Sequence, residues 1–211
     1  MSKNAYLDAV NKIDDSLKSS EGHNFVVRNV SVVDARGIVP NAWILVKDGV
    51  ILKTGILRDD LTAAIHSYGL SASDLSVVDG RGCFAAPGYI DLHAHGAWEH
   101  SFDDGAEGIA IARAYHMLHG TTRQVLSLIT NPLNVMQENL RVVKQVMQTR
   151  PDVLGSHLEG PFLALSRKGA HDPNCLVDPT AERVEALLEA ADGTLRQITT
   201  CLLYTSLMAR G

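Results

Sequence analysis

The pattern of hydrophobic and polar positions changes its period along the chain. Near the N-terminus apolar residues recur at helical spacing, which predicts a helical extension over residues 1–22. Over residues 23–86 the period becomes that of strands, and β-branched runs are split by Gly37 and by an Asp48-Gly49 turn. This second pattern predicts a small β-rich domain in which the first strands are antiparallel.

Strand-like and helix-like segments alternate over residues 87–200. Alternation of this kind is typical of βαβ units around a parallel sheet, either wound open or closed as a barrel. We expect the last helix to begin at Pro179, behind an Asp178 cap. The expected strands are 84–92, 121–129, 153–158 and 195–199, and the expected helices are 105–119, 132–148 and 179–191.

Composition and charge exclude several classes of protein. With 211 residues, of which 45% are hydrophobic, the chain can form a globular core in one or two domains. The net charge of -5 carries no long Lys/Arg run, so we expect no nucleic-acid and no membrane partner. The chain shows no signal peptide, and its three cysteines are odd in number without a CxxC pair. We therefore expect a cytoplasmic protein with reduced thiols.

Two histidines lie one residue apart where the first barrel-type strand is expected to end. In LHAHG, residues 92–96, the side chains of His93 and His95 point to the same face of an extended chain. Two neutral imidazoles on one face can bind a single divalent ion. The alternative is a chance pair of polar residues at a strand exit.

A second group of polar residues ends the strand expected at 153–158. In GSHLEGPF, residues 155–162, His157 and Glu159 share a face, and Gly160-Pro161 breaks the strand behind them. A carboxylate beside imidazoles suits zinc, iron or manganese. The alternative is a solvated or helix-capping glutamate. Since chemistry in such folds collects at the carboxyl edge of the sheet, the two groups together indicate a candidate metal site.

The loop LALSRKGAHDPNCLVD, residues 163–178, follows without clear periodicity. Arg167, Lys168 and His171 give it a local positive charge, and Gly169 allows the backbone to approach a ligand closely. An anion such as a phosphate could bind here. An exposed basic loop without a ligand is the alternative.

The order of these features resembles the metal-dependent amidohydrolase superfamily. A β unit ending in VKDGVILKTG precedes VVDGRGCFAAPGYIDLHAHG and the alternating region. Within that superfamily, the motifs HGAWEHSFDDG, HGTT, HLEGPF and RKGAHDP resemble the N-acetylglucosamine-6-phosphate deacetylase family. The resemblance covers roughly residues 25–199. It implies an α/β fold made of about the first half of a TIM-like (β/α)8 barrel, preceded by a small β-sandwich domain.

The resemblance also implies an activity and a cofactor. The activity is hydrolysis of the acetamide of N-acetylglucosamine 6-phosphate, which gives glucosamine 6-phosphate and acetate. Glu159 is implied as a metal ligand, and His93 and His95 as ligands of a second ion in those members that keep both histidines. The implied cofactor is one or two divalent ions per subunit, with zinc expected first and iron, manganese or cobalt as alternatives. Such an ion polarises the amide carbonyl and activates water.

Further residues and the assembly follow from the same resemblance. Ala170 and His171 are implied as substrate contacts. His157 either orients Glu159 or simply packs, and we expect the supporting role. No catalytic residue is expected within the chain, because the catalytic aspartate of the family and two further metal histidines lie beyond residue 199. We therefore expect this chain alone to be inactive and the full-length protein to be a homodimer.

The final stretch departs from the family pattern. Residues 201–211, CLLYTSLMARG, stand where a segment like LAPE would continue the fourth strand. CLLYTS is also what a transposon end used in sequencing libraries encodes. We therefore expect a non-native tail and leave it out of the fold prediction. The alternative is a natural, divergent C-terminus.

Two other functions stay open on the residues alone. One is a different metal-dependent amidohydrolase that acts on a cyclic amide or a nucleobase, against which RKGAHDP argues. The other is a non-catalytic protein of the same fold. The presence of His93, His95 and Glu159 together argues against this second alternative.

Overall fold

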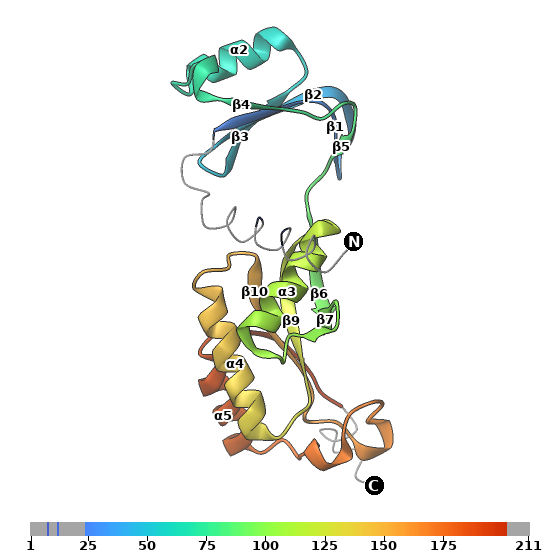
Figure 1. The fold of residues 1–211 in the computed structure, drawn as a ribbon. Coiled ribbons are helices and arrows are strands. Elements are labelled where there is room, and N and C mark those ends of the chain that lie inside the picture. The colour runs from blue at the N-terminus through green and yellow to red at the C-terminus, as the bar shows by residue number, and fades with distance from the viewer. Residues whose placement is uncertain (1–7, 9–11, 13–23, 202–211) are drawn as a thin grey trace. The chain divides into compact units, whose positions relative to one another are not determined.

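The computed structural model describes Asp8, Lys12 and residues 24–201. Residues 24–87 belong to one compact unit and residues 88–201 to a second, and Figure 1 labels most of their elements. The predicted N-terminal helix lies outside the described residues apart from Asp8 and Lys12, and the tail lies outside them from residue 202 onward.

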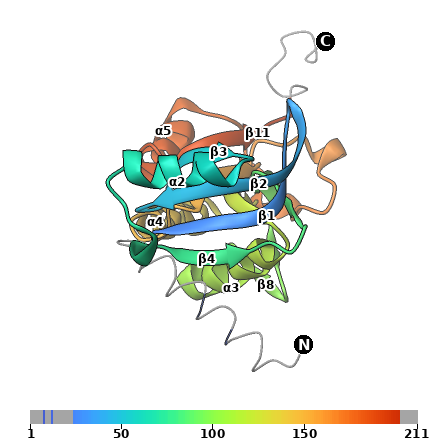
Figure 2. The ribbon, with the colours of Figure 1, turned by 90° about the horizontal axis from the view of Figure 1, so that it is seen from above.

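The smaller unit contains one mixed β-sheet. As predicted, β1 (Phe25–Asp34), β2 (Gly37–Lys47) and β3 (Val50–Gly55) form antiparallel pairs. Two later strands, β4 (Ser76–Asp79) and β5 (Phe84–Ala85), pair with β1 in parallel. Figure 2 shows the strands in the order β3-β2-β1-β4. The described residues thus supply one sheet of the predicted β-sandwich.

A helix, rather than a second sheet, packs on this small sheet. Helix α2 (Arg58–Ser67) buries Ala64 against a cluster that contains Trp43 and Leu45 of β2. The indole nitrogen of Trp43 donates to the carbonyl oxygen of Leu57 at 2.9 Å, just before the helix begins. Burial of this indole with its donor satisfied fixes the entry of α2 on the sheet.

The larger unit is built on a parallel sheet of four strands. They are β6 (Tyr89–Ala94), β9 (Thr121–Ile129), β10 (Val153–Glu159) and β11 (Leu195–Thr199), in the order β11-β10-β9-β6. Four parallel strands are half the number in a (β/α)8 barrel. The predicted fold class is confirmed in this unit.

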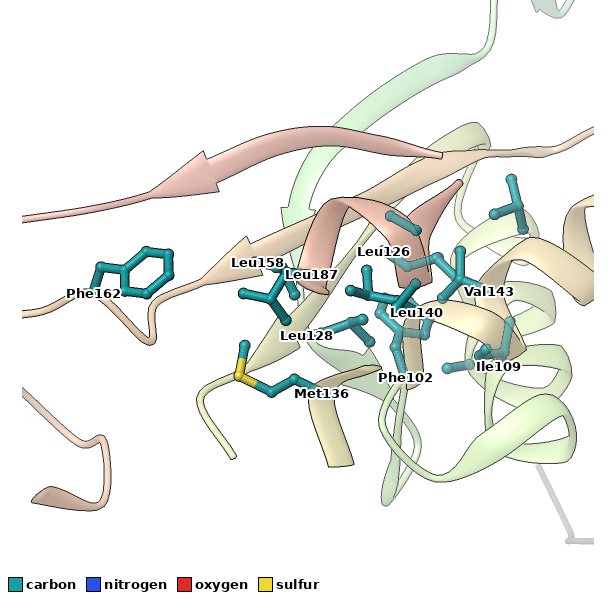
Figure 3. Close-up of a cluster of buried hydrophobic side chains, with 14 residues drawn as sticks. Phe102, Ile109, Leu126, Leu128, Met136, Leu140, Val143, Leu158, Phe162 and Leu187 are labelled. Carbon is teal, nitrogen blue, oxygen red and sulfur yellow. The ribbon is translucent and has the colours of Figure 1, made fainter. Parts of the chain in front are cut away.

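Three helices connect these strands and cover one face of the sheet. They are α3 (Gly105–Leu118), α4 (Leu133–Met147) and α5 (Ala181–Ala191), and all three contribute to a single buried cluster with the strands. None of the helices in the described part of the chain has both the length and the apolar character needed to cross a bilayer. Figure 3 shows side chains of this cluster, among them Leu126, Leu128, Leu140, Leu158 and Leu187.

Two expected element boundaries were wrong. The strand expected at 84–92 is divided, because β5 pairs with β1 of the small sheet whereas β6 begins at Tyr89. Pro87 lies between them and has no N–H to continue a ladder. Helix α5 begins at Ala181, and its cap is Thr180, whose hydroxyl accepts from the N–H of Arg183 at 3.4 Å. A threonine cap two residues later in the chain therefore replaces the expected Asp178.

Candidate metal centre

Residues from two strand ends meet at the carboxyl edge of the parallel sheet. His93 and His95 lie at the end of β6, and Glu159 is the last residue of β10. Because β6 and β10 flank β9, the three side chains converge over the end of β9. One potential ligand atom from each lies within 4.8 Å of the others, and the three form the one such group found among the described residues.

The distances within this group are those of closely facing donors. The Nε2 atom of His95 lies 2.7 Å from Oε2 of Glu159, and Nε2 of His93 lies 3.7 Å from Oε1 of the same carboxylate. The two Nε2 atoms are 3.3 Å apart. Both Nε2 atoms and the two carboxylate oxygens therefore lie around one small volume.

This donor set fits a divalent metal ion. Two nitrogens bound to one tetrahedral zinc at about 2.0–2.1 Å are separated by about 3.3 Å, which matches the separation of the two Nε2 atoms. A carboxylate oxygen completes a nitrogen and oxygen set that zinc, iron and manganese accept. The exposed fractions of the three side chains lie between 26% and 48%, so a ligand from solvent can reach them.

The backbone of each donor is held by a neighbouring side chain that the sequence reasoning missed. The Oδ1 atom of Asp91 accepts from the N–H of His93 at 3.0 Å, and the hydroxyl of Thr130 donates to the carbonyl of Glu159 at 2.7 Å. Gly160, with φ +91°, leaves no room for a Cβ, which would lie 2.1 Å from Oγ1 of Thr130. The contact of Asp91 could have been predicted, because an aspartate side chain often accepts a hydrogen bond from the backbone N–H two residues later, which here is that of His93.

His157 is fully buried beside the candidate ligands. Its Nδ1 bonds the hydroxyl of Ser127 and its Nε2 bonds that of Thr199, each at 2.8 Å, so both ring nitrogens are occupied. Its ring packs edge-to-face on His93, with the centroids 4.8 Å apart. Burial, and then the neighbouring charge of His93, lower the pKa of His157. This geometry places the ring of His157 against His93, while its expected support of Glu159 stays a prediction.

The basic loop brings one of its two predicted contact residues to the site. His171 is nearly buried, and its Nε2 lies 3.9 Å from Oε2 of Glu159. Its Nδ1 is buried and has no hydrogen-bond partner within the described residues. Buried nitrogens of this kind are normally satisfied, so a ligand or a further part of the protein is needed here. Ala170 is exposed on the adjoining turn.

Asp103 connects the loop after β6 to the rest of the sheet. Its Oδ2 accepts from the N–H of Ile129 at 3.2 Å, and its Oδ1 accepts from the side-chain amide of Asn139 at 3.0 Å. Burial raises the pKa of Asp103 despite these hydrogen bonds. The carboxylate thus fastens the loop after β6 to the end of β9 and to the middle of α4.

Similar proteins were found by sequence, although no family model matches the chain. The chain is 28% identical over 180 residues to N-acetylglucosamine-6-phosphate deacetylase from Lysinibacillus sphaericus, covering 83% of this chain and 43% of that protein. It is 29% identical over 146 residues to N-acetylgalactosamine-6-phosphate deacetylase from Escherichia coli O157:H7, covering 67% and 37%. The chain therefore spans less than half the length of the curated relatives that it matches.

A solved structure of the same kind of protein is also similar to the chain. The N-acetyl-D-glucosamine-6-phosphate deacetylase of Mycobacterium smegmatis, solved as a mutant in complex with N-acetyl-D-glucosamine-6-phosphate, superposes with a TM-score of 0.68 at 25% identity. The match covers 85% of this chain and 44% of that one. In sequence and in fold the chain is therefore similar to less than half of an N-acetylglucosamine-6-phosphate deacetylase.

Proposed function

We propose that the full-length protein hydrolyses the acetamide of N-acetylglucosamine 6-phosphate to glucosamine 6-phosphate and acetate, with the help of a divalent metal ion. The observation that carries this proposal is the convergence of His93, His95 and Glu159 at the carboxyl edge of a half-barrel sheet. The similarity to deacetylases of phosphorylated amino sugars supports the choice of substrate.

We assign the metal ligands to the three converging side chains. Glu159 faces both imidazoles, so its carboxylate can bridge two ions or serve one ion together with His95. The metal supplies Lewis acidity toward the amide carbonyl of the substrate. Zinc is the ion we expect first, and iron, manganese and cobalt suit the same nitrogen and oxygen donors.

His171 is the residue that we assign to substrate binding. Its Nε2 faces Glu159 while its buried Nδ1 lacks a partner among the described residues, so the ring can bond a polar substrate group without leaving its position. Ala170, on the adjoining exposed turn, offers its backbone beside that ring. His157 supports His93 through ring packing and needs no contact with substrate.

Acetate release by the purified full-length protein tests this proposal. The protein is stripped of metal with a chelator and then given zinc, manganese, iron(II) or cobalt(II), with N-acetylglucosamine 6-phosphate as substrate. We expect no release from the stripped protein and recovery with at least one of these ions. Full activity after complete metal removal, or no release with any of the four ions, would overturn the proposal.

The isomeric sugar is the second candidate substrate, because a curated relative of similar identity is an N-acetylgalactosamine-6-phosphate deacetylase. The two substrates differ in the configuration of one hydroxyl, so the same metal chemistry serves both. Comparing kcat/KM for the two sugar phosphates, with unphosphorylated N-acetylglucosamine as a control, separates them. We expect the glucosamine isomer to be preferred and the unphosphorylated sugar to be poor.

We further propose that the full-length protein acts as a cytoplasmic homodimer and that the 211-residue chain alone releases no acetate. Cys83, Cys175 and Cys201 are all unpaired, which suits a reducing compartment. Size-exclusion chromatography with light scattering tests the dimer. Metal-dependent acetate release by the isolated chain would contradict the expected inactivity.

A further inference from the structure

One side chain of α3 reaches the segment that carries the two candidate histidine ligands. His116 is in the last turn of that helix, and its side chain keeps 19% of its exposure. Its Nε2 lies 3.1 Å from the carbonyl oxygen of Gly96, the residue after His95. Since a carbonyl can only accept, the Nε2 of His116 carries the hydrogen and donates it.

The carbonyl that His116 binds belongs to a tightly packed backbone. Gly96 has φ +145°, and a Cβ there would lie 2.0 Å from the carbonyl oxygen of His100. Gly96 pairs with Ser101 in the hairpin of β7 (Gly96–Ala97) and β8 (His100–Ser101). A hydrogen bond to a carbonyl in so confined a place restricts the peptide plane next to His95.

Apart from the pairing of β6 with β9, the hydrogen bonds to this segment that involve His93 and His95 come from nearby in the sequence. The carbonyl of His95 accepts from the N–H of Phe102 at 2.9 Å and from the hydroxyl of Ser101 at 3.2 Å. The N–H of His93 donates to Asp91 at 3.0 Å. His116, in contrast, belongs to a helix packed into the core. It adds a contact from α3 to the pairing of β6 with β9 and to the hydrogen bonds of Asp103.

His116 also faces the residue on the other side of the histidine pair. Its Nδ1 lies 4.0 Å from Oδ2 of Asp91, whose Oδ1 holds the N–H of His93. The ring is packed beside that of Phe102, with the centroids 6.2 Å apart. One imidazole thus lies next to both ends of the segment from His93 to Gly96.

We propose that His116 is a positioning residue for the metal centre. By donating to the carbonyl of Gly96 it fixes the backbone that aims His95 at Glu159, and it does so without touching the ion or the substrate. The inference rests on the proposed function, because it assumes that His95 binds a metal ion. Residues that orient metal ligands in this way typically change metal affinity by about 10–100-fold when they are replaced.

The same helix offers a matched control. His119 is the residue that ends α3, it is exposed, and its Nδ1 bonds the carbonyl oxygen of Tyr115 within the helix itself, at 2.9 Å. It has the same chemistry as His116 and a similar local bond, but that bond does not involve the histidine segment. Replacing His119 therefore measures the cost of losing a histidine from this helix end.

The test measures binding of cobalt(II) to the metal-free, full-length protein, by competition with a chromogenic chelator and by the visible absorption of the bound ion. The variants are His116→Phe, which keeps a ring but has no donor, His116→Gln, which can place an N–H near the position of Nε2, and His119→Phe. We expect His116→Phe to weaken cobalt binding by about 10-fold or more and to alter the absorption bands. His116→Gln should restore most of the affinity, and His119→Phe should behave like the wild type.

Wild-type affinity in His116→Phe, or an equal loss in His116→Gln and His116→Phe, would overturn the role of His116. If His116→Phe does not fold, as judged by circular dichroism, the comparison of His116→Gln with His116→Met decides in the same way. Failure of the wild type itself to bind cobalt would instead overturn the proposed function.

Discussion

Arg113 and Asp152 form an ion pair in which both side chains are completely buried, with Nε of the arginine 2.9 Å from Oδ2 of the aspartate. The same guanidinium donates to the side chain of Gln124 at 2.6 Å and to the carbonyl of Thr121 at 3.1 Å. These contacts join α3 to β9 and to the residue that precedes β10. The pair therefore lies at the base of the same strands whose other ends carry the candidate site.

Arg113→Leu is expected to destabilise the protein by about 3 kcal/mol, because it removes one of the two arginines that bond the buried carboxylate of Asp152 and leaves the side-chain oxygen of Gln124 without its partner. The measurement is the midpoint of urea unfolding of the full-length protein. Arg141→Leu is the control, since Arg141 forms an exposed pair with Glu138 and its loss should change the midpoint little. Equal midpoints for the two variants would contradict the prediction.

Stability should also depend on pH through Asp152. Burial alone would raise the pKa of this carboxyl, but the hydrogen bond from Arg150 and the charges of Arg150 and Arg113 outweigh it and leave the pKa lowered. The unfolded chain, with an ordinary aspartate pKa of about 3.9, then takes up the proton first as the pH falls. The stabilisation is complete above about pH 4 and is lost as the pH falls through the lower pKa of the folded state.

Asp152→Asn tests this dependence. Unfolding of the wild type and of the variant is followed between neutral pH and about pH 3, below the ordinary aspartate pKa. We expect the wild type to be more stable at neutral pH and the difference to shrink as the pH falls below about 4. A difference that stays constant over this range would show that the charge of Asp152 does not contribute.

Glu159→Gln should reduce bound metal and lower the rate of acetate release by at least about 100-fold in the full-length protein, because an amide keeps the shape of the side chain but loses its charge. Metal content by mass spectrometry and the deacetylation rate are the two measurements. Glu189→Gln, at an exposed position of α5, is the matched control. Normal metal content and turnover in Glu159→Gln would rule out Glu159 as a ligand.

Gly160→Ala should disturb the site through the backbone of Glu159. A methyl group there would lie 2.1 Å from Oγ1 of Thr130, the atom that donates to the carbonyl of Glu159. We expect weaker metal binding and a loss of stability of about 1–3 kcal/mol. Gly193→Ala is the control for backbone strain alone, because Gly193 also has a positive φ, of +81°, but open space around its Cβ position. If both variants lose metal affinity equally, the contact with Thr130 is not the cause.

Much of this arrangement could be predicted from the sequence. The period of apolar residues predicted the alternating strands and helices, and the fact that parallel strands end at one edge predicted that His93 and His95 would meet Glu159. Their geometry agrees with that expectation, while their role as metal ligands stays a prediction.

The supporting contacts could not be predicted, because they join residues far apart in the sequence. Thr130 reaches the carbonyl of Glu159 and His116 reaches that of Gly96 only once the strands and helices have packed. The same reason explains why the single strand expected at 84–92 is divided in two. Its hydrophobic pattern is continuous, but Phe84 and Ala85 pair with β1 of the small sheet while the later residues join β9.

The order of the parallel sheet has a consequence for how the site and the fold depend on each other. His93 is on β6, an edge strand of the described sheet, His95 follows directly after it, and Glu159 is on β10, on the far side of β9. An ion shared by all three would act as a crosslink that passes over β9 and ties β6 to β10. Because the ion binds only while β6 is in place, its binding free energy adds to the free energy needed to detach β6 from β9. Without the metal, the protein would then hold β6 less firmly and would also lack the proposed activity.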